Sequence, residues 1–429
     1  MSMDSFDNTF NKRLNRIENA LTGKRPDRVP FLPAFHYFPA RYCKVTYHDY
    51  AFNYEIFYNC VVKVFKEFNF DAAGFVAPGA GIPGPLGMPI IFAEKFPELL
   101  TVIPSFTGPL HDILGDKYTK WPGRELDVNK PAQIAYVDAP YMTVDEYAEL
   151  ARDPEYFLVN KIIPRVYRNL SMPGTPHYIA TLIKIGLEAA KFNAVNLRLF
   201  NELKNMGYPI LPFSFSTVPA DYIADNLRCP HSYALTDIYR VPAEFKAASE
   251  ALLPYLIKLG LKPMPPANIR SSLFGTEVGV VFIPLHLNEM LPPKLYSEFY
   301  WPYLRKLVEE FHRSGLKSWI FFEGDHTPHL ETILEAPKGS IIAYFERTNL
   351  RKAGEVLGGH VVLMGGISVA HLIHGTPERV FNEVCNLLKE MKEFGVFIFS
   401  GSGVGGIPDE TKPENLRAAV EAVSRCGEY

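Results

Sequence analysis

The 429-residue sequence lacks the segments that membrane and secreted proteins carry. No apolar run reaches the roughly 20 residues that a membrane-spanning helix needs. The N-terminal segment carries charges throughout and lacks the apolar centre of a signal peptide. We therefore expect a cytoplasmic protein without a membrane partner.

An excess of one charge is also missing. Lys and Arg number 44, Asp and Glu number 47, and no run of five like charges occurs. A nucleic-acid-binding surface usually shows a cluster of basic residues. We therefore expect no nucleic-acid partner.

Cysteine is scarce, and its spacing shows no motif. The five cysteines are far apart and form no Cys-x-x-Cys pair: Cys43, Cys60, Cys229, Cys385 and Cys426. An odd number of widely spaced cysteines predicts reduced thiols, as in a cytosolic protein.

Aromatic residues are abundant, with 31 Phe and 23 Tyr, and hydrophobic residues make up 47% of the chain. Such a composition is typical of a globular protein with a sizeable core. The aromatic residues indicate either a bulky core or a wide apolar pocket. No linker rich in Gly or Ser divides the chain, so we expect a single domain over residues 1–429.

The second half of the chain alternates short apolar runs with amphipathic segments, as repeated strand–helix units do. The predicted strands are 279–285, 318–322, 340–345, 360–364 and 396–400, and the helices begin near Trp301, Thr327, Asn349, Thr376 and Pro413. Such units give parallel strands because each right-handed crossover returns the chain to the same end of the sheet.

The first half supplies three further strands, at 29–38, 71–76 and 210–216, which brings the total to eight. A barrel and an open doubly wound sheet both have parallel strands, and eight strands are what a barrel needs. The expected fold is α/β, a (β/α)8 TIM barrel with an N-terminal leader. A long insertion rich in Pro and Tyr follows the second strand, over residues 77–208.

The active site of a TIM barrel lies at the C-terminal ends of its strands. The polar and aromatic residues at these ends are the candidates: His36, Tyr37, Phe215, His286, Phe321, Glu323, Asp325, His326 and Glu346. A histidine beside a strand is often a core residue, and an aspartate before a helix is often its cap. The pattern alone leaves both roles open.

Six segments of the chain share motifs with one known family, in that family's order. They are NRIENALTGKRPDRVPFLPAF (15–35), PADYIADNLR (219–228), LPPKLYSEFYWPYLRKLVEEFHRSGLKSWIFFEGD (291–325), LGGHVVLMGGI (357–367), HGTPERVFNEVCNLL (374–388) and FIFSGSGVGGIPDETKPENLRAAVEAV (397–423). They resemble the uroporphyrinogen decarboxylase superfamily, which includes corrinoid-dependent methyltransferases. The resemblance implies a (β/α)8 barrel, in agreement with the strand count.

Two departures from the family pattern distinguish between its branches. True decarboxylases carry an Arg-rich segment after the first strand and an acidic residue after the second. In this chain the segment after the first strand, AFHYFPARY, contains a single arginine, Arg41. The segment after the second strand, GFVAPGAG, contains no acidic residue. The thiol-methylating branch holds zinc through a His-x-Cys pair at the fifth strand and a Cys at the eighth, where this chain has Phe321-Phe322-Glu323 and Ser400–Ser402.

With these two branches set aside, the chain resembles the remaining one, the substrate:corrinoid methyltransferases of O-demethylase systems. They move a methyl group from a methoxylated aromatic or similar methylated substrate to cobalt. The chain has no Asp-x-His-x-x-Gly cobalt-ligand signature, so cobalamin would be carried by a partner corrinoid protein.

Such a reaction requires the departing oxygen or nitrogen to be protonated or coordinated. We expect Glu323, with Asp325 or His326, to act as the acid. Alternatively, Glu323 and His286 could hold zinc through hard ligands, without the cysteines of related enzymes. The residues expected around the substrate are His36, Tyr37, Phe215, His286, Phe321 and Glu346.

Two other functions stay open from the sequence. A divergent carboxy-lyase would release carbon dioxide from a smaller acid without cobalamin. A barrel that only binds a ligand would not depend on Glu323 for its effect.

Overall fold

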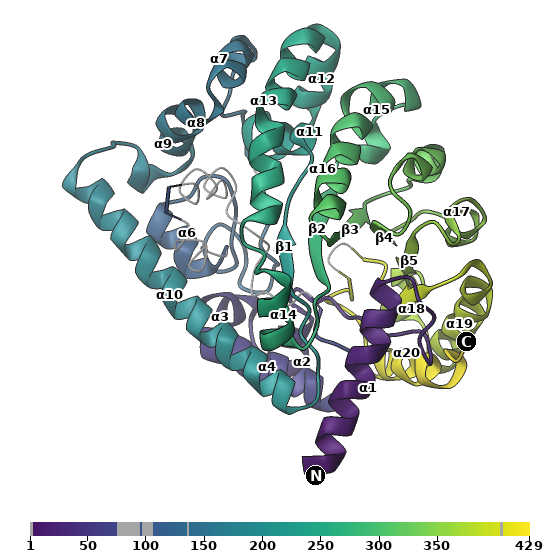
Figure 1. The fold of residues 1–429 in the computed structure, drawn as a ribbon. Helices are drawn as coiled ribbons and strands as arrows, with labels where there is room; N and C mark the ends of the chain where they lie inside the picture. Colours follow the sequence, from purple (N-terminus) through teal and green to yellow (C-terminus); the bar gives the residue numbers. More distant parts are fainter. Residues whose placement is uncertain (1–2, 75–94, 97–105, 135–136, 404–405) are drawn as a thin grey trace.

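The computed structural model describes residues 3–74, 95–96, 106–134, 137–403 and 406–429. They contain one parallel sheet of six strands in the order β1-β2-β3-β4-β5-β6. The strands are β1 (Phe213–Phe215), β2 (Gly279–Leu285), β3 (Leu316–Phe322), β4 (Ile341–Phe345), β5 (Val362–Gly365) and β6 (Phe397–Phe399). An α/β fold with a parallel sheet is thus confirmed (Figure 1).

Helices occupy most of the rest of the described chain. Those before β1 are α1 (Met3–Leu21), α2 (Phe38–Cys43), α3 (Tyr47–Phe52), α4 (Tyr54–Glu67), α6 (Gly108–Leu114), α7 (Tyr147–Arg152), α8 (Pro154–Phe157), α9 (Ile163–Val166) and α10 (Pro176–Asn205). Those after β1 are α11 (Pro219–Tyr222), η6 (Ile223–Leu227), α12 (Ser232–Arg240), α13 (Pro242–Leu261), α14 (Ala267–Phe274), α15 (Pro293–Phe299), α16 (Trp301–Arg313), η8 (Thr327–Glu335), α17 (Leu350–Leu357), α18 (Val369–His374), α19 (Pro377–Met391) and α20 (Pro413–Cys426).

The sheet separates two apolar cores because side chains alternate between its faces. On the inner face, Val280, Trp319 and Ile342 form a cluster with Ile17 and Leu21 of α1. On the outer face, the remaining strand residues belong to the larger core, which also contains the apolar stripe of α16: Val281, Ile283, Leu285, Ile320, Phe322, Leu304, Leu307, Val308 and Phe311. The near-continuous apolar runs of the strands follow from this burial on both faces.

The expected first two strands are extended segments rather than regular strands. Phe31 forms a parallel bridge with Phe399 of β6, and Ala73 forms one with Ile210, just before β1. The amide of Asp71 also donates to the carbonyl of Phe31 at 3.1 Å. These links are compatible with a TIM barrel, and the closed eight-stranded form stays a prediction. Residues 75 and 76 of the second expected strand lie outside the described residues.

The helices predicted in the second half are confirmed, with one difference. Asn349 caps α17 by accepting from the amide of Lys352, and Thr376 caps α19 by accepting from that of Arg379. The segment that begins at Thr327 forms the 3-10 helix η8 instead of an α-helix.

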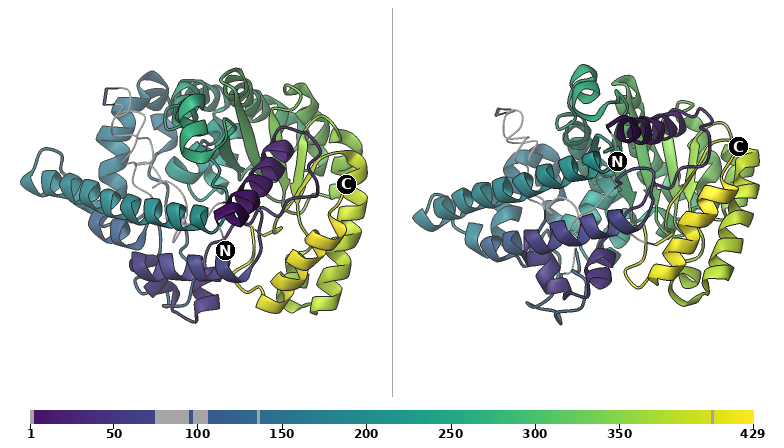
Figure 2. Two further views of the ribbon diagram at one scale, coloured as in Figure 1. Left: turned by 60° about the horizontal axis from the view of Figure 1, so that its bottom comes forward. Right: turned by 90° about the horizontal axis from the view of Figure 1, so that it is seen from below.

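The described part of the expected insertion is mainly helical. Its longest element, α10, has 30 residues, is capped by the side chain of Thr175 and runs along the edge of the molecule (Figures 1 and 2). The structure leaves residues 77–94, 97–105 and 135–136 of the expected insertion undescribed.

The prediction of five reduced cysteines is wrong for four of them. Cys43 is bonded to Cys60 and Cys385 to Cys426, while Cys229 is buried and forms no disulfide bond. Each bond joins two elements that pack together in space, α2 with α4 and α19 with α20. Sequence spacing could not show this pairing because it depends on helix packing.

Within the ranges that the structure describes, no helix is both long enough and apolar enough to span a membrane.

Candidate functional site

Three predicted site residues lie side by side at the carboxyl end of the sheet. Leu285, Phe322 and Phe345 are paired across β2, β3 and β4, so the next residues along the chain, His286, Glu323 and Glu346, come at one level. Side-chain alternation gives these three residues the inner face, opposite to that of their predecessors. His286 Nε2 lies 3.5 Å from Glu323 Oε1, and Glu346 accepts the amide of Gly324 at 2.7 Å.

Two carboxyl groups reach the same place from the segment after β1. Asp221 in α11 and Asp225 in η6 are four residues apart, about one helical turn. Asp225 Oδ2 lies 2.7 Å from His286 Nδ1, and Asp225 Oδ1 lies 2.8 Å from His231 Nε2. We call Asp221, Asp225, His231, His286 and Glu323 the acid–imidazole cluster.

Asp221 fixes the backbone that carries His286. Its carboxylate accepts the amide of His286 at 3.2 Å and that of Leu287 at 3.0 Å. The hydroxyl of Tyr300, in the turn between α15 and α16, donates to the same carboxylate. Asp221 is fully buried, so these bonds replace the water that a carboxylate would otherwise bind.

The members of the cluster have pKa values shifted in different directions. Burial raises the pKa of Glu323 to about 7 and that of Asp221 to about 6. Burial would also lower the pKa of His286, but the carboxylate of Asp225 outweighs it and raises the pKa to about 10. Burial acts against the charge of Asp225, but the two imidazoles lower its pKa to about 2. The result is an ion pair between Asp225 and His286 beside a carboxyl that can hold its proton.

Asp325 and His326 do not join the cluster. Gly324 has φ +68°, and a Cβ on it would lie 2.0 Å from the carboxylate of Glu289, so only glycine fits this turn. The turn breaks the alternation that would have put Asp325 on the same face as Glu323. Asp325 instead accepts the amide of Thr327 at 3.0 Å, at the start of η8.

His326 lies in the core. Its side chain is fully buried, and its ring packs against Phe322, Tyr296 and His329. The Asn288 amide lies 3.1 Å from its Nδ1. Burial lowers its pKa well below the usual value, so this histidine is neutral.

The other predicted substrate residues lie at different places. Phe321 packs against Tyr344 on the inner face, and the half-buried Phe215 faces Phe282. Tyr37 is buried against Tyr47, and its amide donates to Asp409 at 2.7 Å.

His36 directly precedes Tyr37. Burial lowers its pKa to about 4, so its imidazole is neutral near pH 7. Of the predicted binding residues, the structure thus brings only His286 and Glu346 to Glu323.

Sequence reasoning missed Asp225 and His231, and it left Asp221, just after the third predicted strand, without a chemical role. The segment PADYIADNLR contains both aspartates at the one-turn spacing, and His231 follows three residues later. That spacing could have indicated two carboxyl groups on one helical face. Their approach to His286, more than 50 residues later in the chain, depends on the packing of α11 and η6 beside β2.

Three cluster residues have donor atoms placed for a cation. One ligand atom each of Asp225, His231 and His286 lies within 4.8 Å of the others. Two imidazoles and a carboxylate are a set that zinc and similar metals accept. The sequence had predicted His286 with Glu323 for this role.

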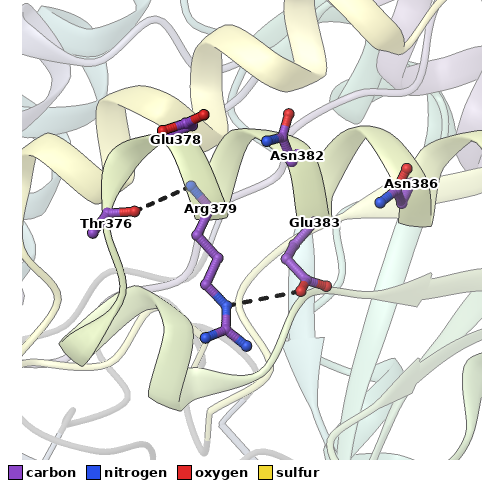
Figure 3. A pocket seen from close by; sticks show the side chains of 6 residues that line it. All are labelled: Thr376, Glu378, Arg379, Asn382, Glu383 and Asn386. Atoms are coloured by element: carbon purple, nitrogen blue, oxygen red, sulfur yellow. Dashed lines mark hydrogen bonds and ion pairs between the residues drawn. The ribbon is translucent and has the colours of Figure 1, made fainter.

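A hollow of about 290 Å³ lies elsewhere on the surface. Figure 3 shows its lining side chains, which all come from the start of α19 and its cap: Thr376, Glu378, Arg379, Asn382, Glu383 and Asn386. Arg379 and Glu383 pair along this helix at 3.9 Å. None of these residues belongs to a strand end, so we assign the hollow no role.

Comparisons with known proteins agree with the predicted resemblance. The family model for uroporphyrinogen decarboxylase (URO-D) matches residues 271–426, a segment that includes His286, Glu323 and Glu346. The chain is similar in structure to a methyltransferase from Methanosarcina mazei, with a TM-score of 0.57 and 15% sequence identity, over 97% of this chain and 98% of that chain. No curated protein matches the sequence. The chain therefore resembles the uroporphyrinogen decarboxylase family in sequence over residues 271–426 and shares a fold with a methyltransferase over nearly its whole length.

Proposed function

We propose that this chain is a methyltransferase that moves a methyl group from a methoxylated aromatic, or a similar methylated substrate, to the cobalt of a partner corrinoid protein. The observation that carries the proposal is the placement of Glu323 beside His286 on adjacent strand ends, 3.5 Å apart. The fold shared with a methyltransferase supports the reaction class. We further propose that the sheet closes into the (β/α)8 barrel, with this pair at its mouth.

The proposed reaction needs an acid at the departing atom. The methyl carbon leaves its oxygen and bonds to the reduced cobalt of the partner, which supplies the electron pair of the new bond. The oxygen keeps the electron pair of the broken bond and takes a proton from Glu323. The imidazolium of His286, held by Asp225, then faces the carboxylate that Glu323 becomes.

Glu323 suits this role by its surroundings. Its side chain is about one-quarter exposed, so a substrate can reach it, while the burial of the rest favours its neutral form. Phe321, two residues before it on the same face, is buried against Tyr344 and forms part of the core beneath Glu323.

Methyl transfer to cobalt can be tested directly. The purified chain is mixed with cobalamin reduced to Co(I) and with pools of methoxylated aromatics or methylated amines. The expected result is the absorbance of methylcobalamin with one pool. The absence of methylcobalamin, with free cobalamin and with candidate corrinoid proteins, would overturn the proposal.

A carboxy-lyase is the second candidate, because the matching family model is that of a decarboxylase. It predicts carbon dioxide release from an organic acid in the absence of cobalamin. Measuring carbon dioxide in the same reactions separates the two functions.

A further inference from the structure

We infer that Asp225, His231 and His286 form a binding site for one divalent first-row metal ion such as Zn²⁺. This inference rests on the proposed function and deepens it: the metal would take the place of the proton on His286, would lie beside Glu323 and could coordinate the departing oxygen. It differs from the metal position that the family resemblance implies, which uses cysteines at the ends of two other strands. Here the donors come from η6, the loop after it and the end of β2.

The donor atoms of the three residues lie close together. Asp225 lies between the two imidazoles, with its two oxygens 2.8 Å from His231 Nε2 and 2.7 Å from His286 Nδ1. The two rings are nearly parallel, with an interplanar angle of 15° and centroids 6.2 Å apart. A cation that replaced the shared protons would find one carboxylate oxygen and two ring nitrogens within 4.8 Å of one another.

The surroundings favour a cation at this place. Asp221 and Glu323 add two more carboxyl groups to the cluster, and the partners of Asp221 are a phenol and two backbone amides rather than a basic side chain. Side chains of His231 and His286 are 31% and 28% exposed, so an ion can enter from solvent. Two imidazoles with a carboxylate also leave coordination positions for water or a substrate oxygen.

The backbone on both sides of the site is held in place. Asp221 binds the amides of His286 and Leu287, which fixes the start of the loop that carries one imidazole. The other donors belong to one continuous segment, in which His231 follows Asp225 by six residues. Such supporting contacts are typical of metal sites, where they orient the ligands.

Metal binding can be measured on the full chain without methyl donor or cobalamin. The protein is treated with a chelator, the chelator is removed, and Zn²⁺ is titrated by calorimetry. In a parallel titration, Co²⁺ serves as a probe through its visible absorption. We expect one ion per chain and, for Co²⁺, bands typical of a site with nitrogen and oxygen ligands.

The ligands are tested by His231→Ala, with His312→Ala as the control on the exposed face of α16. Removing an outer-shell contact typically weakens metal binding by about 10- to 100-fold, and the loss of a ligand should weaken it at least as much. His312→Ala should bind as the unmodified protein does. Thermal melting of each variant without metal checks that it is folded, and Asp225→Asn provides a second variant if His231→Ala unfolds.

Three outcomes would overturn the site: no binding, binding unaffected by both site variants, or equal weakening by the His312 control. The methyl-transfer assay fails or succeeds independently of these measurements. Metal binding without methylcobalamin formation would keep the site and reject the proposed function. Methyl transfer by the chelator-treated chain, together with no Zn²⁺ binding in the titration, would keep the proposed function and reject the site.

Discussion

The two ends of the sheet hold their charges in different ways. At the amino end, Asp71 is buried between Arg16, at 2.5 Å, and Arg28, at 2.8 Å. Arg16 also pairs with Asp27 at 2.6 Å, and Asp71 accepts the amide of Phe31 at 2.7 Å. Guanidinium groups stay charged at any ordinary pH, so this network of two Arg and two Asp is neutral and fixed.

At the carboxyl end, the acid–imidazole cluster contains three carboxyls and two imidazoles. Its charge depends on where protons or a cation sit, because every member titrates. The sheet thus carries a fixed ionic network at its amino end and a titratable cluster at its carboxyl end, where the proposed reaction would take place. In TIM barrels, too, residues at the amino end serve stability and those at the carboxyl end serve catalysis.

Replacing the proposed acid should give the largest effect. Glu323→Gln keeps the shape of the side chain but removes the proton, so we expect kcat for methyl transfer to fall by about 10²- to 10⁴-fold. The melting temperature should stay nearly unchanged, because burial disfavours the charged form of Glu323 and the neutral amide of Gln carries no such cost. Glu355→Gln, on the outer surface of α17, is the matched control and should keep full activity. An active Glu323→Gln enzyme would remove the acid role.

A substitution at the amino end should act on stability instead. Asp71→Asn leaves two buried guanidinium groups without their shared carboxylate, which should cost about 3–5 kcal/mol in the free energy of unfolding. Urea denaturation measures the change. Asp112→Asn, which breaks the exposed pair with Arg124, should cost less than about 1 kcal/mol. Equal costs for both variants would contradict the contrast between buried and exposed pairs.

A substitution of Asp325 tests whether a residue close to Glu323 in sequence but outside the acid–imidazole cluster takes part in the proposed reaction. Asp325→Ala removes the carboxylate that accepts the amide of Thr327 at the start of η8, and we expect a loss of about 0.5–2 kcal/mol in stability, as for a capping contact. Methyl transfer should change far less than in Glu323→Gln, since Asp325 is exposed and its carboxylate bonds Thr327 rather than a member of the cluster. A comparable loss of kcat would restore the assignment made from the sequence.

The smallest effect should come from Asp27, which is half exposed. The hydrogen bond from Arg16 lowers the pKa of Asp27 in the folded chain. Its contribution is therefore complete above the unfolded pKa, near 4, and is lost as the pH falls through the folded pKa. Asp27→Asn should cost less than about 1 kcal/mol at pH 7. The difference from the unmodified protein should shrink toward pH 3, as urea denaturation at both pH values would show, whereas a constant difference would exclude the ion pair as its cause.

Local patterns determined the parallel α/β fold and the place of Glu323. The strand 279–285 has the predicted bounds and the helix 301–313 begins where predicted, because continuous apolar runs and helical periodicity depend on neighbouring residues. The expectation that chemistry follows the strand ends placed His286, Glu323 and Glu346 together. Their register follows from the strand pairing alone.

Tertiary structure decided which of these groups come into contact and which pKa values they have. The turn at Gly324 separates Asp325 from Glu323, although strand alternation would have joined them. The packing of η6 beside β2 brings Asp225 and His231 to His286, and helix packing pairs the cysteines. Long-range contacts and burial also set the pKa values of the cluster, and neither quantity is contained in the local pattern of a sequence.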